Sequence, residues 1–302
     1  MPRPSEQSDT GPQRARIPCV LSIAGSDSGG GAGIQADLKA FAACGVHGMT
    51  AVTAITAQNT VEVTAVQPVS AELIVAQVRA VAHDIGVDAI KVGMLGTVAT
   101  IEAVARVLDE LGGRDRVPVV LDPVMVAESG AALLDPSARG ALIELLLARA
   151  TVATPNLPEA RALTGLDDER DPAVLARAVH ALGPSAVVVT GGHREQAIDI
   201  LFDGDTLVEI GGVRHPDGAA HGSGCTHSSV LAARLAWGDT TLAAARAAKL
   251  RASQAVRDGL VTVGAGAGPV NVLGIVEGAP GAMTPGAWRP IRRSDIIEAC
   301  AF

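Results

Sequence analysis

The chain has 302 residues, of which 48% are hydrophobic, and it contains no tyrosine. This length and composition suit one α/β domain with a large core. The formal net charge is −8 and no long basic run occurs, which argues against nucleic-acid binding by neutralisation of phosphates. A phosphorylated ligand would therefore need a local attractive site.

The cysteines and the amino terminus indicate where the protein works. The four cysteines are far apart and fit neither a metal-site spacing nor a disulfide-rich pattern: Cys19, Cys44, Cys225 and Cys300. The amino-terminal segment lacks an apolar core of signal-peptide length, and no window forms a clean 18-residue apolar span. We therefore expect a cytoplasmic protein in a reducing compartment, with no membrane partner.

The ends of the chain differ in composition from its centre. We expect residues 1–16 to form a disordered leader, residues 17–273 a single domain, and residues 274–302 a carboxyl-terminal appendage of uncertain order.

Between these ends, short apolar runs alternate with segments of helical periodicity. In chain order, the pattern predicts strands at 19–24, 49–56, 89–95, 117–124, 151–156 and 186–192. It predicts helices at 34–45, 71–86, 98–113, 137–150, 158–165, 172–183, 224–236 and 241–258. This alternation predicts a three-layer α/β fold, in which helices cover both faces of a mostly parallel central sheet.

Two segments interrupt the rhythm with an alternating apolar pattern. They surround Val61 and Ile200, and the second contains an Asp-Gly turn. Both are typical of small antiparallel edge strands or of a lid. As exposed edges, they are also candidates to pair between the subunits of a homodimer.

In an open α/β sheet, ligands bind beyond the carboxyl ends of the strands. The loop HGSGCTHS, which begins at His221, leads directly into a predicted helix. We expect backbone N–H groups there to converge on an anion such as a transferring phosphoryl group. They belong to Gly222, Ser223, Gly224 and Cys225. No GxxxxGK[ST] motif occurs, so this is not a Walker loop.

Cys225 has three interpretations. A thiol at a helix amino terminus has a lowered pKa, so Cys225 would be a thiolate or would accept a proton from a substrate hydroxyl. It would equally fit as a small buried residue that fills space. A metal site made by His221, Cys225 and His227 is the third interpretation, although the glycines between them favour a tight turn.

Asn156 and Glu159 lie three residues apart at a predicted helix start, a spacing typical of a capping box. They also suit a magnesium site, because Mg²⁺ keeps most of its waters and needs few protein ligands. Asp122, just after an apolar strand, is a candidate to add a carboxylate to that site or to cap the following turn.

These loops, taken in order, resemble those of the ribokinase superfamily, and within it the hydroxymethylpyrimidine and phosphomethylpyrimidine kinases of thiamine biosynthesis. The resemblance covers roughly residues 20–271 and rests on AGSDSGGGAGIQADLKAF, TAQNT, KVGML, LDPVM, TPNLPEA, GGH and HGSGCT. It implies a ribokinase-like fold and phosphorylation by ATP and Mg²⁺ of 4-amino-5-hydroxymethyl-2-methylpyrimidine, then of its monophosphate, at one site.

The resemblance also implies roles for particular residues. It assigns the pyrimidine site to Gly25, Asp37, Gln58 and Met94. It assigns ATP and phosphate binding to Asn156, Glu159, Thr190 and Gly192, and the metal to Asp122 and Glu159 through water. Cys225 stands where sugar kinases of the superfamily carry an aspartate base, among the glycines of the anion hole.

Two positions depart from the family pattern. Glu128 replaces a cation that is common after LDPVM, and Thr190 stands where a basic residue often precedes GGH. Either change would reduce the attraction for the triphosphate or for the monophosphate intermediate, with Lys91 as a candidate to compensate. The alternatives are a pyridoxal kinase, a non-catalytic pyrimidine-binding regulator and a hydrolase that uses Cys225 as nucleophile.

Overall fold

The computed structural model describes residues 16–191 and 197–276. Its strands are β1 (Cys19–Asp27), β2 (His47–Gln58), β3 (Val63–Pro68), β4 (Ala89–Val92), β5 (Val119–Leu121), β6 (Val152–Ala153), β7 (Ala186–Val189), β8 (Asp199–Phe202) and β9 (Leu207–Ile210). Residues 1–15 of the predicted leader, the tail from residue 277 onward and Gly192 lie outside the described residues.

The helices alternate with the strands over most of the chain. They are α1 (Gly33–Ala43), α2 (Ala71–Asp84), α3 (Val98–Glu110), α4 (Ala138–Leu145), α5 (Leu157–Thr164), α6 (Pro172–His180), α7 (Ser223–Ala236) and α8 (Thr241–Arg257), with a 3₁₀ turn at Leu147–Arg149. Side-chain oxygens of Ser70, Thr97 and Thr240 accept backbone N–H groups at the starts of α2, α3 and α8. These caps satisfy donors that a helix leaves unpaired at its first turn.

All the strands belong to one nine-stranded sheet, in the order β3-β2-β1-β4-β5-β6-β7-β8-β9. Every pair from β2 to β7 is parallel. The pairs β2/β3, β7/β8 and β8/β9 are antiparallel and extend the sheet at its two edges. The mostly parallel sheet with small antiparallel edges is therefore confirmed.

The segment around the Asp-Gly turn forms the predicted antiparallel edge, the hairpin of β8 and β9. Ile200 lies in β8, between β7 and β9, and its side chain is buried. The outermost strand on this side is β9, after the turn that follows Phe202. At the other edge β3 is exposed, as expected for the segment that begins near Val61.

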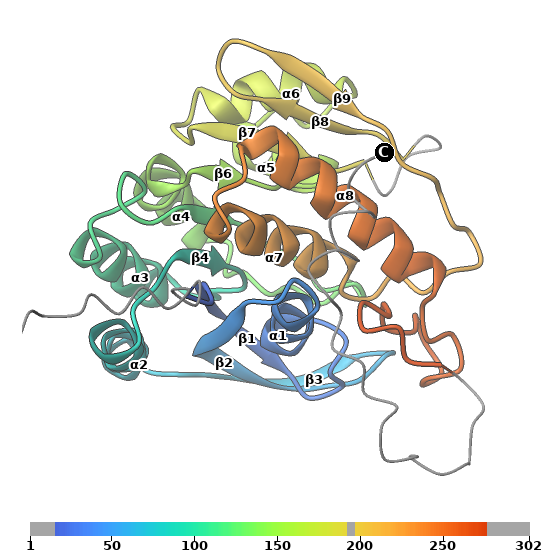
Figure 1. Cartoon of the computed structure of the whole chain (residues 1–302), viewed down its shortest axis with the longest axis horizontal. Coiled ribbons are helices and arrows are strands. Elements are labelled where there is room, and N and C mark those ends of the chain that lie inside the picture. The colour runs from blue at the N-terminus through green and yellow to red at the C-terminus, as the bar shows by residue number, and fades with distance from the viewer. Residues whose placement is uncertain (1–15, 192–196, 277–302) are drawn as a thin grey trace, which may run out of the picture.

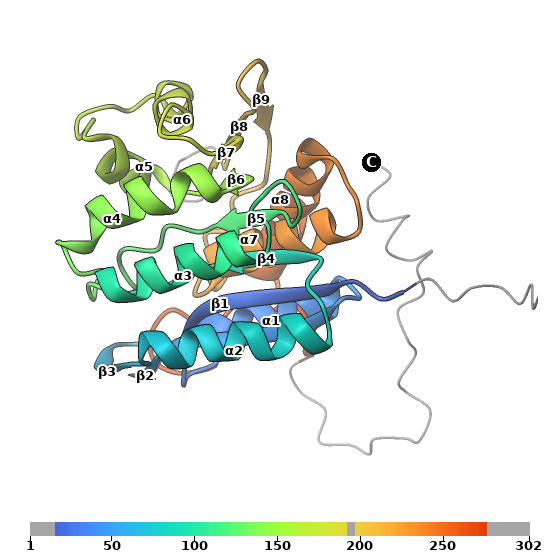
Figure 2. The same ribbon diagram turned by 90° about the vertical axis from the view of Figure 1, so that its left-hand side faces the viewer.

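Alternate side chains of the central strands enter two separate cores. Leu21 and Ile23 of β1 pack under α2 to α6, whereas Val20 packs under α1, α7 and α8. Figure 1 shows α7 and α8 crossing one face of the sheet, and Figure 2 shows α2, α3 and α4 stacked along the other. This period-two burial produces the three layers.

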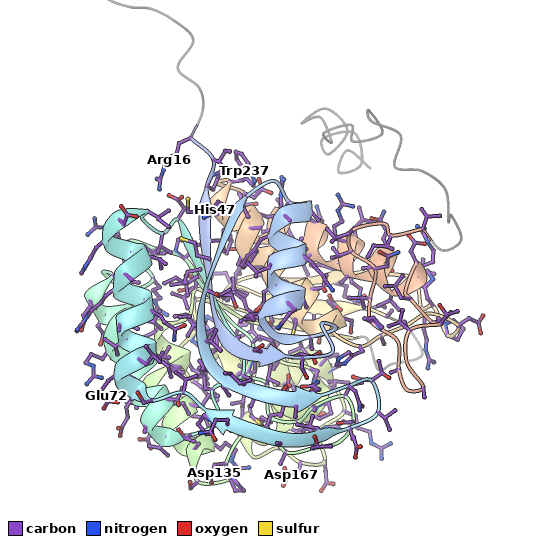
Figure 3. All side chains as sticks on the ribbon, turned by 90° about the horizontal axis from the view of Figure 1, so that it is seen from below. Arg16, His47, Glu72, Asp135, Asp167 and Trp237 are labelled. Carbon is purple, nitrogen blue, oxygen red and sulfur yellow. The ribbon has the colours of Figure 1, made fainter. Side chains whose placement is uncertain are left out.

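The two ends of the sheet can be told apart in Figure 3. Arg16, His47 and Trp237 lie at one end of the molecule, where β1 and β2 begin, and Asp135 lies at the opposite end. The backbone N–H of Asp135 donates to Gly96, just beyond the end of β4. Within the part of the chain that the structure describes, no helix is long and apolar enough to cross a membrane.

Candidate active site

A cavity of about 410 Å³ opens at the carboxyl ends of the parallel strands. It is lined by residues at or just after the carboxyl ends of β1, β2, β4, β5, β6 and β7 and by the segment that leads into α7. The predicted site residues that it brings together are Gly25, Gln58, Met94, Asp122, Asn156, Glu159, Thr190, Gly222, Ser223, Gly224 and Cys225. Loops far apart in sequence thus share one wall, as the topology of parallel sheets requires.

The start of α7 forms the centre of this wall. Gly222 is its N-cap, with φ 85°, and makes no side-chain cap. A Cβ at Gly222 would lie 1.8 Å from the carbonyl oxygen of Gly31, so only glycine fits there. The N–H of Ser223 donates to the Ala220 carbonyl at 3.0 Å, contrary to our expectation that all four N–H groups face the ligand. The amides of Gly222, Gly224 and Cys225 remain the candidates for an anion-binding cradle at the start of α7, called the cradle below.

Cys225 is half-buried and opens to the cavity. Burial raises the pKa of its thiol to about 12; nearby Lys91 opposes that rise, whereas Asp37 and Asp122 add to it. The prediction of a lowered pKa is therefore wrong. Although Cys225 lines the cavity, its thiol lies among protein atoms and near two carboxylates, and both effects disfavour the thiolate.

Asp37 does not line the cavity. Its fully buried carboxylate lies 2.9 Å from the Lys91 ammonium and accepts the hydroxyls of Ser22 and Ser229 at 2.6 and 2.7 Å. The predicted direct contact of Asp37 with the pyrimidine does not fit this placement, because its oxygens already have donors. Asp37 instead fixes Lys91, which does line the cavity.

The sequence pattern suggested only a compensating role for Lys91, whereas the structure places this residue at the centre of the site's charged groups. It lies within the apolar strand β4, and its side chain is 1% exposed. Burial by itself lowers the pKa of a lysine, but Asp37, Cys225 and Asp122 raise the pKa of Lys91 overall. Its ammonium is 4.0 Å from Asp122, so it places a positive charge beneath the cradle.

Asn156 and Glu159 form the predicted capping box at the start of α5. The Glu159 carboxylate accepts the Asn156 N–H, and the Asn156 side chain accepts the Glu159 N–H, both at 2.9 Å. Burial, followed by the nearby Asp122, raises the pKa of Glu159 to about 8. Burial also raises the pKa of Asp122, although Lys91 and the Ser228 hydroxyl oppose it.

Asp122 and Glu159 thus form a pair of buried carboxylates that repel one another. A divalent cation beside them would relieve that repulsion, and carboxylate oxygens are the ligands that Mg²⁺ prefers. The donor set fits a magnesium ion that keeps most of its waters. Over residues 16–191 and 197–276, no group of three or more His, Cys, Asp or Glu side chains is placed to hold a metal by itself.

The alternative metal site of His221, Cys225 and His227 is not formed, because the two histidines have different partners. His221 Nε2 lies 3.0 Å from Asp27, and His227 Nε2 lies 3.1 Å from Asp199. The glycines between them produce the turn into α7 rather than a cage of ligands.

Asp27 is a second residue that sequence reasoning missed. Its carboxylate accepts the backbone N–H groups of Gly29, Gly31 and Ala32 at 2.8 to 3.0 Å, in addition to its contact with His221. Although burial opposes it, these bonds hold the pKa of Asp27 below its ordinary value. Asp27 therefore connects the glycine-rich loop after β1 to His221, the residue just before the cradle.

The two halves of the cavity differ in character. The half over β1, β2 and β4 holds Gly25, Gln58 and Met94, and a Cβ at Gly25 would lie 2.9 Å from the Met94 sulfur. The Gly25 backbone and the Met94 thioether are therefore in close contact in this half, called the slot below, and Gln58 lines the same half. A short hairpin, closed by a bridge between Val126 and Ala132, borders the cavity and carries Glu128.

The other half lies over β7, β8 and the start of α8. It is lined by Thr190, which bridges to Asn156, and by Asp199, which is 2.6 Å from the Lys249 ammonium. Small and apolar side chains complete it: Ala197, Val213, Pro216, Ala252 and Val256. The cradle lies between this half and the slot, because α7 contacts β4 and β5, which lie between β1 and β7 in the sheet.

The comparisons agree with this geometry. The family described as phosphomethylpyrimidine kinase matches residues 27–271. This chain belongs to that family. The hydroxymethylpyrimidine/phosphomethylpyrimidine kinase of Rhizobium meliloti is 52% identical over 259 residues, covering 83% of this chain and 96% of the relative. The Bacillus subtilis protein of the same name is 43% identical, over 83% of this chain and 93% of its own.

Solved structures place the family within a wider group of kinases. The phosphomethylpyrimidine kinase of Clostridium difficile is 38% identical, with a TM-score of 0.66 over 77% of this chain and 97% of that one. A Bacillus subtilis pyridoxal kinase in an ADP complex is 40% identical, with a TM-score of 0.76 over 85% of this chain and 97% of its own. The predicted family and ribokinase-like fold are confirmed, and the chain is a kinase.

Proposed function

We propose that this protein transfers a phosphoryl group from ATP to the hydroxymethyl group of 4-amino-5-hydroxymethyl-2-methylpyrimidine, and then a second one to the monophosphate formed, in cytoplasmic thiamine biosynthesis. The observation that carries the proposal is the start of α7 between the slot and the other half of the same cavity. An acceptor in the slot and a nucleotide in the other half would meet at the cradle.

The slot suits an aminopyrimidine. Such a ring presents donors and acceptors along one edge, which the Gln58 amide matches, and its flat face fits against the Met94 thioether. Gly25 allows close approach, because any Cβ there would displace the Met94 sulfur. We assign these three residues to the acceptor, and Asp37 to the support of Lys91.

The residues of the cradle act by position and charge. In phosphoryl transfer, negative charge spreads over the equatorial oxygens, and the amides of Gly222, Gly224 and Cys225 would stabilise it without any reorganisation. A thiol whose pKa is about 12 is protonated at neutral pH. We therefore assign Cys225 to orienting the acceptor hydroxyl, with Lys91 behind it, because a largely dissociative transfer needs little help from a strong base.

Mg²⁺ would be held near Asp122 and Glu159, through water in the case of Glu159, and would neutralise phosphate charge when bound. Asn156 keeps Glu159 in place through the capping box. Thr190, which bridges to Asn156, borders the same region and is assigned to the nucleotide phosphates. Gly192 keeps its assignment by resemblance to the family.

A pyridoxal kinase is the second candidate, and a specific likeness supports it. Solved pyridoxal kinases from Bacillus subtilis and Staphylococcus aureus align over 85% of this chain at 40% and 33% identity. Pyridoxal and the pyrimidine both carry a hydroxymethyl group on a flat nitrogen ring, so the slot alone does not separate them.

Product analysis separates these functions. The protein is given ATP, Mg²⁺ and either the pyrimidine alcohol or pyridoxal, and products are followed by mass. We expect the pyrimidine monophosphate and then the pyrophosphate, at rates well above that of pyridoxal phosphate. Much faster phosphorylation of pyridoxal would overturn the proposal. Arrest at the monophosphate would restrict it to the first step, the outcome that Glu128 and Thr190 would cause by weakening attraction for an anionic acceptor.

The same samples test the remaining alternatives. Binding of the pyrimidine in a calorimeter without formation of ADP would identify a non-catalytic regulator. A cysteine hydrolase would lose all activity on Cys225→Asp, because its nucleophile is removed, whereas the kinase retains measurable turnover.

A further inference from the structure

The positive charges of the cavity wall are distributed unevenly. The described lining includes six side chains that carry or can carry positive charge: Lys91, Arg214, His215, His221, His227 and Lys249. A polyphosphate bound in this cavity would need some of that charge to be available.

Five of the six are engaged by other parts of the protein. Lys91 is held by Asp37, and Lys249 by Asp199. His221 contacts Asp27, His227 contacts Asp199, and His215 lies 3.1 Å from the Ser253 hydroxyl. Arg214 has no hydrogen bond or ion pair with any residue in 16–191 or 197–276, and it is exposed.

The backbone around Arg214 is nevertheless fixed. The Ser253 hydroxyl of α8 donates to the carbonyl of Val213 at 3.2 Å and also contacts His215. At Gly212, two residues before Arg214, an added Cβ would lie 2.4 Å from the Lys249 side chain. The segment that carries Arg214 is therefore in close contact with α8. Arg214 is therefore presented from a held segment on the nucleotide half of the cavity, eight residues before Gly222.

The rest of the lining offers a polyphosphate little available positive charge. Asp27 and Asp199 are the partners of committed cations, and Asp122, Glu128 and Glu159 add further carboxyl groups to the same cavity. The chain as a whole carries a formal charge of −8, so its general field repels a nucleotide polyphosphate. A guanidinium supplies a permanent charge and a planar fork of donors that matches phosphate oxygens.

We propose that Arg214 binds the polyphosphate of the nucleotide and is the free cation of the described cavity wall that draws it into the cavity. This proposal rests on the proposed kinase function. It makes Arg214 a binding residue, so its removal should raise the KM for ATP more than it lowers kcat.

The test compares Arg214→Gln with Arg246→Gln. Arg246 is an exposed arginine of α8 that does not line the cavity, so both variants lose one charge from the same region. Calorimetry measures the Kd of ADP and of adenosine, with Mg²⁺ present. Loss of a charged hydrogen bond to phosphate should weaken ADP binding roughly tenfold to a hundredfold in Arg214→Gln and by less than about twofold in Arg246→Gln.

Binding of adenosine distinguishes a loss of phosphate recognition by Arg214 from a general disturbance of packing in the cavity. It carries no phosphate, so its Kd should be the same in Arg214→Gln and in the unaltered protein, and Arg214→Lys should recover part of the ADP affinity. Unchanged ADP binding in Arg214→Gln, or equal weakening of ADP and adenosine, would overturn the role of Arg214. Because these measurements need no turnover, they stand apart from the proposed reaction, whose failure would appear as missing phosphorylated product.

Discussion

Lys91 and Asp37 form an ion pair of 2.9 Å in which both side chains are 1% exposed or less. Lys91 comes from β4 and Asp37 from α1, and they are 54 positions apart in the sequence. The hydroxyls of Ser22 and Ser229 also donate hydrogen bonds to the Asp37 carboxylate. The pair connects the interior of the sheet to the wall of the cavity, because Lys91 lies between Asp37 and Asp122.

Removal of the ammonium should be costly. Lys91→Met leaves the Asp37 carboxylate buried without its cation, and we expect the free energy of unfolding to fall by roughly 3 kcal/mol or more. Urea unfolding measures this. The control is Arg79→Gln, which breaks the exposed pair of Arg79 with Glu110 and should have a far smaller effect. Equal losses in the two variants would contradict a structural role for the buried pair.

The same pair predicts a dependence of stability on alkaline pH. The folded-state pKa of Lys91 is raised, so its contribution is complete below the lysine pKa of the unfolded chain. It should be lost as pH rises through the higher folded-state value. Unfolding measured as pH rises through the ordinary lysine pKa of 10.5 should therefore show a decline in the unaltered protein that is weaker in Lys91→Met.

Glu159 is an acid whose folded-state pKa, about 8, also lies above its ordinary value, so its effect on stability has the same sign at lower pH. The folded protein holds a proton that the unfolded chain releases, so stability should fall as pH rises from about 4.5 to about 8. Glu159→Gln keeps a capping side chain and should remove roughly 1–3 kcal/mol of that decline. Thermal unfolding at several pH values in the absence of metal checks this.

Added Mg²⁺ provides a further readout for the same variant. The ion should raise the unfolding temperature of the unaltered protein at pH 8, because it relieves repulsion between Asp122 and Glu159. The rise should be smaller in Glu159→Gln. An identical rise in both proteins would remove Glu159 from the magnesium site.

The two glycines at the start of α7 allow the cradle to be tested apart from folding. A Cβ added at Gly224 would meet no other described part of the chain within 4 Å, so Gly224→Ala should fold normally. The methyl should still obstruct the phosphate and lower kcat by roughly tenfold to a thousandfold. Steady-state kinetics and thermal unfolding are measured together, and full activity in Gly224→Ala would exclude the amide cradle.

Gly222→Ala is the matched comparison. Its positive φ and the Gly31 carbonyl, which would lie 1.8 Å from the new methyl carbon, should cost at least about 2 kcal/mol of stability as well as activity. Stability like that of Gly224→Ala would show that the turn tolerates side chains and that the backbone there is not constrained as described.

Cys225 should be a poor nucleophile despite its place at a helix start. With a pKa of about 12, its alkylation by iodoacetamide at pH 7.5 should be at least about a hundredfold slower than that of glutathione. Mass analysis of the peptide that contains Cys225 measures its alkylation. Protein unfolded in urea gives the alkylation rate of Cys225 without protection by the fold. Modification of folded Cys225 at the glutathione rate would restore the thiolate interpretation.

The amino-acid sequence by itself determined the order of strands and helices. Apolar runs such as 19–24 and helical spacing such as that of 98–113 reflect burial of one face or both, which is a local property. It also determined the capping box of Asn156 and Glu159 and the turn at Gly222, because these depend on neighbours only a few residues away.

Only the tertiary structure decided the charge states and partners at the site. Asp37 is isolated from the cavity, the pKa of Cys225 is raised, and Asp27 contacts His221. Each of these features depends on residues that are far apart in sequence and are brought together by the order of strands in the sheet. Electrostatic effects depend on distance and burial in space, and neither can be read from separation along the chain. For the same reason, Arg214 became a candidate only when every other cation of the described cavity wall had been placed beside a partner.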